Sequence, residues 1–359
     1  MAQLPQIAIL GAGIFVKTEY IPRLAEISDL FILRAIWSRS EESAKGAVEI
    51  AKKFFPEVEC KWGEAGLDEI IQDASIIGVL VVLAANIQVD MSVRLLKGGK
   101  HVLQEKPAAA SLSEVETALS FYSSLSTTLP FKPIWAVAEN YRFEPAFVEG
   151  TKLMAEIGDT VNFQIIVEVP MNSSSPYFST SWRHNFTGGF ILDMGVHFIA
   201  TLRMLTGCEV TSVSAMTSHV DKSLPPPDSI SSTIQMENGC SGVYVTVVSA
   251  KSLKLLWRVV GLKGTLQFEV EKREGSIGYL VTLFTSDGQS KSSYYPSSGV
   301  TEELKTFISD ISHATIEKDH SHQPEPRITY LEGARDVAVL EAMLESGERK
   351  GELVQVKKF

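Results

Sequence analysis

The first third of the chain alternates short apolar runs with amphipathic stretches. The apolar runs are typical of buried strands, and they lie at Ile7–Leu10, Phe31–Trp37, Ile76–Ala84, His101–Gln104 and Ile134–Ala138. Between them, apolar residues at helical spacing predict helices over Glu41–Phe54, Gln88–Lys97 and Leu112–Leu125. Strands that alternate with helices form βαβ units, so this part of the chain predicts a parallel sheet.

The rest of the chain has a different rhythm, because turns rather than long helices separate its apolar runs. Strand-like runs lie at Val161–Val169, Val210–His219, Ile230–Met236, Cys240–Ser249, Leu256–Val260, Thr265–Val270 and Gly278–Phe284. Helical patterns return at Thr301–Ile316 and at Tyr330–Ser346. Consecutive strands without crossover helices predict a mostly antiparallel sheet.

The two patterns meet at a cluster of turn-forming residues between Ser126 and Pro133. A chain of 359 residues is too long for one core of ordinary size. We therefore expect an α/β domain with a parallel sheet at residues 1–130. An α+β domain with a large, mostly antiparallel open sheet is expected at residues 131–359.

Composition narrows the class of protein. The 43 acidic and 33 basic residues give a net charge of −10, and the lack of a basic stripe argues against nucleic acid or an anionic membrane as a partner. The longest apolar run, Ile76–Ala85, is shorter than the ~20 residues of a spanning helix. The first residues show no signal-peptide pattern. Cys60, Cys208 and Cys240 are widely spaced, as free thiols in a reducing compartment are, so a cytoplasmic location is expected.

Gly11-Ala12-Gly13 stands where the first predicted strand passes into a helix. At such a turn the first glycine permits a tight bend and the second lets the backbone approach a pyrophosphate, which helix N-terminal amides bind. The third small residue of this dinucleotide fingerprint is missing, because Val16 occupies its place. A plain glycine turn is the alternative interpretation, and the position at the first βα turn favours the dinucleotide.

The end of the second predicted strand bears on the choice between NAD and NADP. Proteins that bind NAD usually place an acidic residue there, to hold the ribose 2′-hydroxyl. Here the strand ends in Ser38-Arg39-Ser40, and no acid lies between Asp29 and Glu41. A hydroxyl and a guanidinium suit a 2′-phosphate better than a bare ribose, so the sequence favours NADP. The alternative is a solvated loop with an ordinary surface arginine.

An apolar strand ends in Glu105-Lys106-Pro107, which would hold a cation at its carboxyl end. Open parallel sheets bind their ligands at that edge. In the second part of the chain, Asp193 and His197 are four residues apart and lie on one face if a helix begins by Asp193. A histidine beside a carboxylate is suited to proton transfer near neutral pH. A purely structural histidine is the alternative, and the adjacent Gly188-Gly189 indicates that the backbone there approaches another group closely.

These motifs, in this order and spacing, resemble the glucose-fructose oxidoreductase, inositol dehydrogenase and MocA family (Gfo/Idh/MocA) over nearly the whole chain. With Gly13-Ile14-Phe15 in the first loop, the chain is similar to uncharacterised fungal and plant NADP-linked members. The resemblance implies a Rossmann domain, followed by a C-terminal domain that binds substrate and forms oligomers. Two departures are Val16 and Leu83-Ala84-Ala85, which stands where Thr-Pro-Asn is frequent.

The resemblance also implies roles for individual residues. Lys106 would position the substrate oxygen and the nicotinamide, His197 would be the acid/base, and Asp193 would support it. Residues expected to bind the cofactor are Gly11, Gly13, Ile14, Phe15, Ser38, Arg39, Leu83, Ala84, Asn86, Gln88, Glu105, Lys106, Pro107, Asn140, Trp182 and Arg183. An arginine near the cofactor is also common in the stretch that holds Asn140-Tyr141-Arg142.

Two functions from different classes fit the sequence. The first is an NADP-dependent oxidoreductase that transfers a hydride to or from a sugar, polyol or other small carbonyl or alcohol compound. The alternative is a non-catalytic regulator that binds a dinucleotide and a protein partner on the same fold. The joint presence of Lys106, Asp193 and His197 favours the enzyme. A homodimer or homotetramer through the C-terminal sheet is expected, and the histidines around His322 lack the spacing of a metal site, so no metal is expected.

Overall fold

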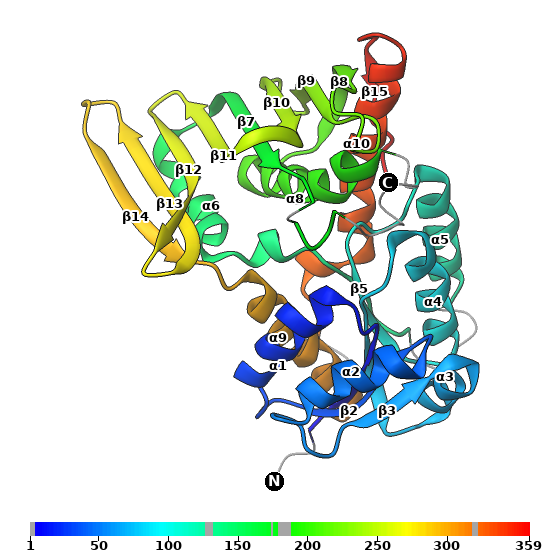
Figure 1. The fold of residues 1–359 in the computed structure, drawn as a ribbon. Helices are drawn as coiled ribbons and strands as arrows, with labels where there is room; N and C mark the ends of the chain where they lie inside the picture. Colours follow the sequence, from blue (N-terminus) through cyan, green and yellow to red (C-terminus); the bar gives the residue numbers. More distant parts are fainter. Residues whose placement is uncertain (1–3, 126–131, 174, 179–187, 318–321) are drawn as a thin grey trace. The chain divides into compact units, whose positions relative to one another are not determined.

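The structure, a computed structural model, describes residues 4–125, 132–173, 175–178, 188–317 and 322–359. It divides into two compact units. The first unit consists of Met1–Glu139 and Val300–Ala334, and the second of Asn140–Gly299 and Arg335–Phe359. Figure 1 shows the elements of both units along the chain.

The first unit is built on a parallel sheet in the strand order β3-β2-β1-β4-β5-β6. Its strands are β1 (Gln6–Leu10), β2 (Ile32–Ser38), β3 (Glu59–Trp62), β4 (Ile76–Val81), β5 (His101–Glu105) and β6 (Trp135–Ala138). This is the order of a dinucleotide-binding sheet, in which the order of the strands reverses between β1 and β4. The predicted parallel α/β domain is therefore confirmed. The apolar runs of the central strands reflect burial on both faces of the sheet.

Helices connect these strands. They are η1 (Val16–Tyr20), α1 (Ile21–Glu26), α2 (Glu41–Ala51), α3 (Gly63–Gln72), α4 (Ala85–Lys97) and α5 (Leu112–Ser124). Local sequence fixes some of their starts, because Ser40 and Ser111 each accept a backbone N–H as the N-cap of α2 and α5. The crossovers bring the carboxyl ends of all the strands to one edge of the sheet.

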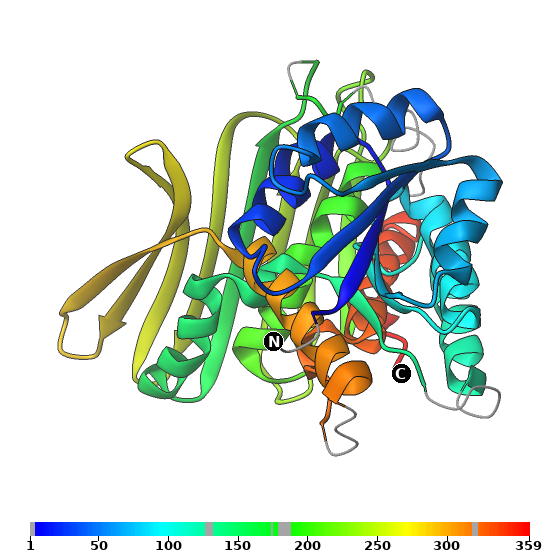
Figure 2. The ribbon, with the colours of Figure 1, turned by 90° about the horizontal axis from the view of Figure 1, so that it is seen from below.

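The division into units differs from the expected boundary between residues 130 and 131. Strand β6 pairs with β5, which extends the first unit to Glu139. The chain also returns to this unit with α9 (Gly299–Ile311), η4 (Ser312–Glu317) and η5 (Pro326–Ile328) (Figure 2). The reason is packing: Ile311 and Phe307 lie against Gly78 of β4, so α9 covers a sheet face that would otherwise meet water.

The second unit is built on a sheet in the order β14-β13-β12-β11-β7-β10-β9-β8-β15. Its strands are β7 (Thr160–Pro170), β8 (Val210–Ser218), β9 (Ser229–Met236), β10 (Ser241–Val247), β11 (Ser249–Gly261), β12 (Gly264–Arg273), β13 (Ser276–Thr285), β14 (Ser290–Pro296) and β15 (Val354–Gln355). Neighbouring strands of this sheet pair antiparallel, except β7 and β10, which pair parallel. The mostly antiparallel sheet is therefore confirmed.

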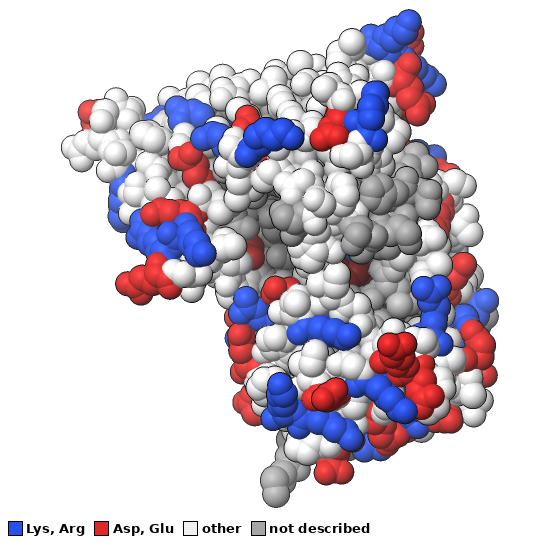
Figure 3. All heavy atoms as spheres, in the orientation of Figure 1, with Lys and Arg blue, Asp and Glu red and all other residues white. Residues whose placement is uncertain are grey.

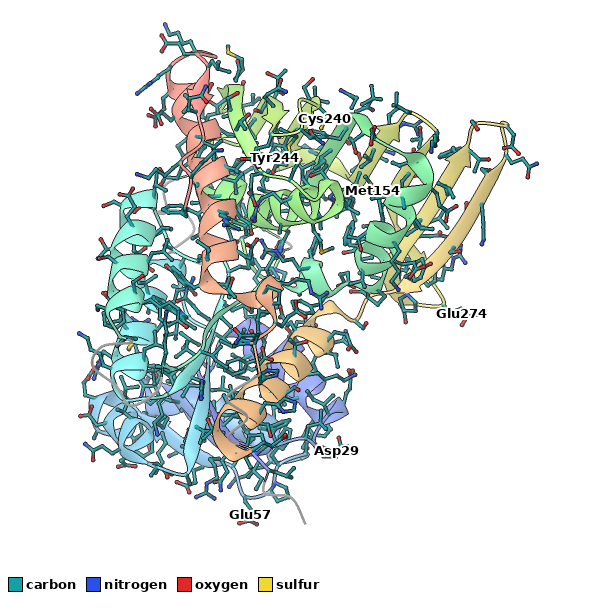
Figure 4. All side chains as sticks on the ribbon, turned by 180° about the vertical axis from the view of Figure 1, so that it is seen from behind. Asp29, Glu57, Met154, Cys240, Tyr244 and Glu274 are labelled. Atoms are coloured by element: carbon teal, nitrogen blue, oxygen red, sulfur yellow. The ribbon has the colours of Figure 1, made fainter. Side chains whose placement is uncertain are left out.

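Helices cover one face of this second sheet (Figure 1). They are η3 (Asn140–Phe143), α6 (Pro145–Ile157), α8 (Gly189–Thr206) and the part of α10 (Tyr330–Glu348) beyond Ala334. Inward side chains alternate with outward ones along the strands, as a sheet covered on one face requires. Tyr244 of β10, labelled in Figure 4, is fully buried on the helix side, and its hydroxyl approaches Gly195 of α8.

Helix α8 is apolar and long enough to match a membrane span by length and composition, the one such helix in the described residues. In this structure 78% of it is buried inside the protein, as the core helix of a soluble protein is. On the face shown in Figure 3, basic and acidic side chains are interspersed. The three cysteines are free.

Candidate active site

Gly11 is required by the fold of the first unit. It follows β1 with φ of +128°, and a Cβ atom there would lie 2.2 Å from the carbonyl oxygen of Val82. The backbone is tied on both sides, since Gly11 donates to the Trp37 carbonyl and Val82 donates to the Leu10 carbonyl, each at 2.8 Å. Gly11 therefore holds together the carboxyl ends of the three central strands.

Gly13 has a different environment. Its φ is not positive, and a Cβ atom added there would meet no protein atom within 4 Å. Nothing in the described protein therefore requires glycine at this position. The helical turn begins at the next residue, Ile14, so unpaired backbone amides lie beside an open surface. A residue without a side chain beside such amides would allow the close approach of a phosphate group.

The missing third glycine of the fingerprint has a structural explanation. Val16 is fully buried and begins η1, a π-helical turn. Pro22 follows in α1 and has no N–H to donate, which favours a wider turn before it. The helix therefore packs on the sheet with a side chain at position 16. Tyr20 ends η1 and points to the buried end of β5, where its hydroxyl donates to Glu105.

The ends of β2 and β4 flank the glycine turn. Ser38 ends β2, and the exposed Arg39 forms no ion pair or hydrogen bond with the described residues. Its guanidinium is therefore available to an anion. After β4, helix α4 begins without a side-chain cap at Ala84, which leaves its first amides unbonded by a cap. Leu83 is half-buried and Asn86 is exposed at the same edge.

The turn after β5 carries Lys106, and buried side chains hold it in place. Gln88 of α4 donates to the Pro107 carbonyl. The Ala108 carbonyl accepts from Gln104 at 2.7 Å and from the hydroxyl of Tyr330 at 3.0 Å. Gln88 and Pro107 were predicted to bind cofactor. Because both are buried and joined to each other, we assign them to the support of the turn.

Glu105, which was also predicted to bind cofactor, lies beneath this turn. Its Oε1 accepts from the Tyr20 hydroxyl at 2.7 Å, and its Oε2 accepts from the backbone N–H of Lys106 at 3.2 Å. Burial raises the pKa of the Glu105 carboxyl to about 7, although the Lys106 ammonium and the Tyr20 hydrogen bond favour its ionised form. Glu105 therefore links the inside of the unit to Lys106, whose side chain is half-buried.

Asp193 and His197 lie one turn apart on α8 of the second unit, on the same face as predicted. Asp193 is buried and His197 is half-buried. The imidazole stacks on the ring of Tyr141, with 4.4 Å between the ring centroids and 17° between the planes. Stacking fixes the orientation of the imidazole and leaves its nitrogens at the ring edge. Tyr141 was not predicted, because its contact joins segments far apart in the sequence.

The paired glycines before α8 have a packing role. Gly188 and Gly189 have φ of +78° and +50°. A Cβ atom at Gly188 would lie 2.6 Å from Leu344 of α10, and one at Gly189 would lie 3.0 Å from Pro225. The close approach that the sequence indicated is therefore to the protein itself, and these glycines are no sign of a ligand.

The remaining predicted residues divide into two groups. Asn140 hydrogen-bonds to Glu144. Arg142, which the family resemblance placed near the cofactor, is buried in an ion pair with Asp336. Arg142 is thus committed to the core of the second unit rather than to a cofactor. Trp182 and Arg183 lie outside the described residues. Within the described residues, no group of His, Cys, Asp or Glu is arranged to hold a metal.

Two family models and several known proteins match the chain. A model of the oxidoreductase family with NAD-binding Rossmann fold matches residues 6–129, and a model of the GFO/IDH/MocA C-terminal domain matches residues 154–267. Dehydrogenase FPY6 of Fusarium mangiferae is 30% identical, over 98% of this chain and 99% of its own. The scyllo-inositol 2-dehydrogenase (NADP(+)) IolW of Bacillus subtilis is 27% identical over 54% of this chain and 49% of its own.

Among solved structures, the aldose-aldose oxidoreductase of Caulobacter crescentus superposes with a TM-score of 0.81 at 21% identity. The superposition covers 99% of this chain and 100% of that one. This similarity shows a shared fold. The fold and the two matched domains define an oxidoreductase with a nucleotide-binding Rossmann unit. The chain belongs to the Gfo/Idh/MocA family, as its motifs indicated, and is an NAD(P)-dependent enzyme.

The two glycines of the first loop provide a matched pair of variants. Gly13→Ala should leave the free energy of unfolding unchanged within about 1 kcal/mol, because the Cβ atom meets no protein atom. The same variant should weaken dinucleotide binding at least tenfold. Gly11→Ala should cost about 3 kcal/mol or more, through its positive φ and the Val82 contact. Urea unfolding and fluorescence titration with NADPH check both variants. Normal NADPH binding by Gly13→Ala would contradict the phosphate role.

Proposed function

We propose that this chain is an NADP-dependent oxidoreductase that transfers a hydride between the nicotinamide and a sugar, polyol or other small carbonyl or alcohol compound. The observation that carries the proposal is a shared edge of the first sheet. Three features follow the carboxyl ends of strands at that edge. They are Gly13 with open space beside it, Arg39 without a partner among the described residues, and the turn of Lys106, which Glu105 and Tyr20 support. When bound, NADP supplies the hydride acceptor or donor. The names of the relatives, which include an NADP-linked inositol dehydrogenase, support the substrate class.

Each of the chain's own residues has a proposed task at the cofactor. The backbone amides of Gly13, Ile14 and Phe15 and the first amides of α4 bind the pyrophosphate, because no side-chain cap uses them, while Gly11 shapes the turn. Arg39 and Ser38 bind the 2′-phosphate. NADP is preferred to NAD on this ground. The absence of an acidic side chain between Asp29 and Glu41 supports the same preference.

The chemistry of the substrate falls to Lys106, His197 and Asp193. The Lys106 ammonium holds the substrate oxygen and stabilises negative charge as it develops there. The imidazole of His197 takes the hydroxyl proton in oxidation and returns it in reduction, a role for which the imidazole side chain is suited. Asp193 supports the imidazolium that forms. Stacking on Tyr141 limits rotation of the imidazole, which keeps its nitrogens oriented.

We also propose that the protein is a cytoplasmic homodimer or homotetramer, joined through the sheet of the second unit. Among the described residues, helices cover one face of that sheet, and Val243 on the other face is 38% exposed. The free cysteines suit a reducing compartment. A monomer by light scattering at micromolar concentration would contradict the oligomer.

Turnover tests the proposed reaction. Purified protein with NADP⁺ and a panel of sugars and cyclic polyols, or with NADPH and diketones and aldehydes, should change absorbance with at least one compound. Lys106→Ala and His197→Ala should each lower kcat about a hundredfold or more while keeping the unfolding midpoint. The matched controls are Lys45→Ala, at an exposed residue, and His313→Ala, at a half-buried residue that pairs with Glu317. Tight NADPH binding without turnover of any compound would favour the non-catalytic regulator.

Cofactor choice is tested separately. Arg39→Ala should weaken NADPH binding roughly tenfold to a hundredfold, the worth of a charge-assisted hydrogen bond, and leave NADH binding nearly unchanged. Arg34→Ala is the control, because Arg34 lies on β2, the strand that precedes Arg39, and pairs with Glu59. Calorimetric titration of each variant with both cofactors measures the difference. Equal losses for NADPH and NADH would remove the 2′-phosphate contact from the proposal.

A further inference from the structure

Behind Lys106, the first unit buries an unusual set of acidic side chains around one phenol. Glu105 is the last residue of β5, Glu139 follows β6, and Glu303 lies on α9. All three are at most 8% exposed, and Tyr20 of η1 is fully buried among them. Burying ionisable groups costs folding free energy, so their retention here indicates a task beyond packing.

The hydrogen bonds of Glu105 indicate its protonation state. Its two carboxyl oxygens accept from two different donors, the Tyr20 hydroxyl and the Lys106 backbone N–H. An ionised carboxylate is an acceptor at both oxygens, whereas a protonated carboxyl presents a donor at one of them. The observed arrangement therefore suits the ionised form. Tyr20 reaches this point because the π-helical turn η1 precedes α1.

Burial and the neighbouring groups together set the pKa of Glu105. Burial raises the pKa most, Lys106 and the Tyr20 hydroxyl lower it, Glu139 raises it, and the net pKa is about 7. Glu303 faces Tyr20, and burial together with Glu105 and Glu303 raises the pKa of the phenol. Tyr20 therefore remains protonated and remains a donor to Glu105.

We propose that Tyr20 is a positioning residue, which acts through Glu105 to hold the backbone turn that presents Lys106. Protonation of Glu105 breaks this arrangement, so the presentation of Lys106 is lost on the acid side of neutrality. The inference rests on the proposed role of Lys106 in the reaction. Tyr20, in this account, touches neither substrate nor cofactor.

The link between Tyr20 and Glu105 is tested without substrate or cofactor. An infrared titration follows the carboxyl band that disappears in Glu105→Gln. In the wild-type protein the band should titrate with a midpoint near pH 7. Tyr20→Phe removes a hydrogen bond that favours the ionised form, so the midpoint should rise by roughly one pH unit. Tyr122→Phe is the control, because Tyr122 is a half-buried tyrosine of the same unit that donates to the Pro133 carbonyl instead. An unchanged midpoint in Tyr20→Phe would overturn the proposal.

The link to Lys106 is tested by turnover. In Tyr20→Phe the acid limb of kcat should move to higher pH by the same amount as the infrared midpoint, and the rate at high pH should recover to within about threefold. In Glu105→Gln the rate should fall at all pH values. Adding Tyr20→Phe to it should cost nothing further, since Tyr20 acts only through Glu105. Additive losses, or an acid limb that stays in place, would contradict the positioning role.

The two proposals fail in different ways. If the wild-type protein turns over no compound, the proposed function fails, and the acylation rate of the Lys106 amine replaces turnover as the readout. Measured by mass spectrometry, that rate should change alike in Tyr20→Phe and Glu105→Gln, and stay constant in Tyr122→Phe. If it is the same in all of these proteins, Tyr20 does not position Lys106.

Discussion

The hydrogen bonds that fix the turn after β5 are the constraint on which the candidate site depends. A lysine side chain has many rotamers, so its use at a defined point requires a rigid backbone beneath it. Here Gln88, Gln104 and Tyr330 bind the carbonyls of the turn, while Glu105 binds its N–H. These donors come from β5, α4 and α10, so the turn is held from several directions.

This arrangement explains why polar residues occupy buried positions near the edge of the sheet. Apolar replacements would pack as well, but they would leave the carbonyls of the turn without partners. Among these buried polar residues, Glu105 costs the most folding free energy, because its pKa near 7 indicates that burial disfavours the charged carboxylate. Such a cost is common where a functional group must be oriented. Gly11 contributes in the same way, by tying β1 to its neighbours so that the loops that follow share one edge.

Much of the fold could be predicted from the sequence, because buried strands are recognisable as apolar runs. β4 and β5 are examples. β3 was missed, since it is short, lies at the edge of the sheet and carries Glu59 and Lys61. The assignment of α9 to the second domain differed from the structure for a similar reason. Its apolar face packs on Gly78, a contact between residues far apart in the chain that no local pattern reveals.

Candidate site residues could be proposed from the sequence where they form a local motif. Gly11, Gly13, Lys106, Asp193 and His197 stand at turns or on a helix face that spacing alone identifies. Tyr20, Tyr141 and Glu303 were not found, because each acts through a tertiary contact. The close approach at Gly188 and Gly189 was predictable but its partner was not, since sequence cannot distinguish a glycine that admits a ligand from one that admits Leu344 or Pro225.

The most direct test of the central claim is the reactivity of the Lys106 amine with and without NADPH. Lysine acylation, read residue by residue by mass spectrometry, needs no knowledge of the substrate. If Lys106 is presented to the nicotinamide, saturating NADPH should slow its acylation severalfold and leave the exposed Lys45 and Lys272 unaffected. An equal rate for Lys106 with and without NADPH would contradict the account.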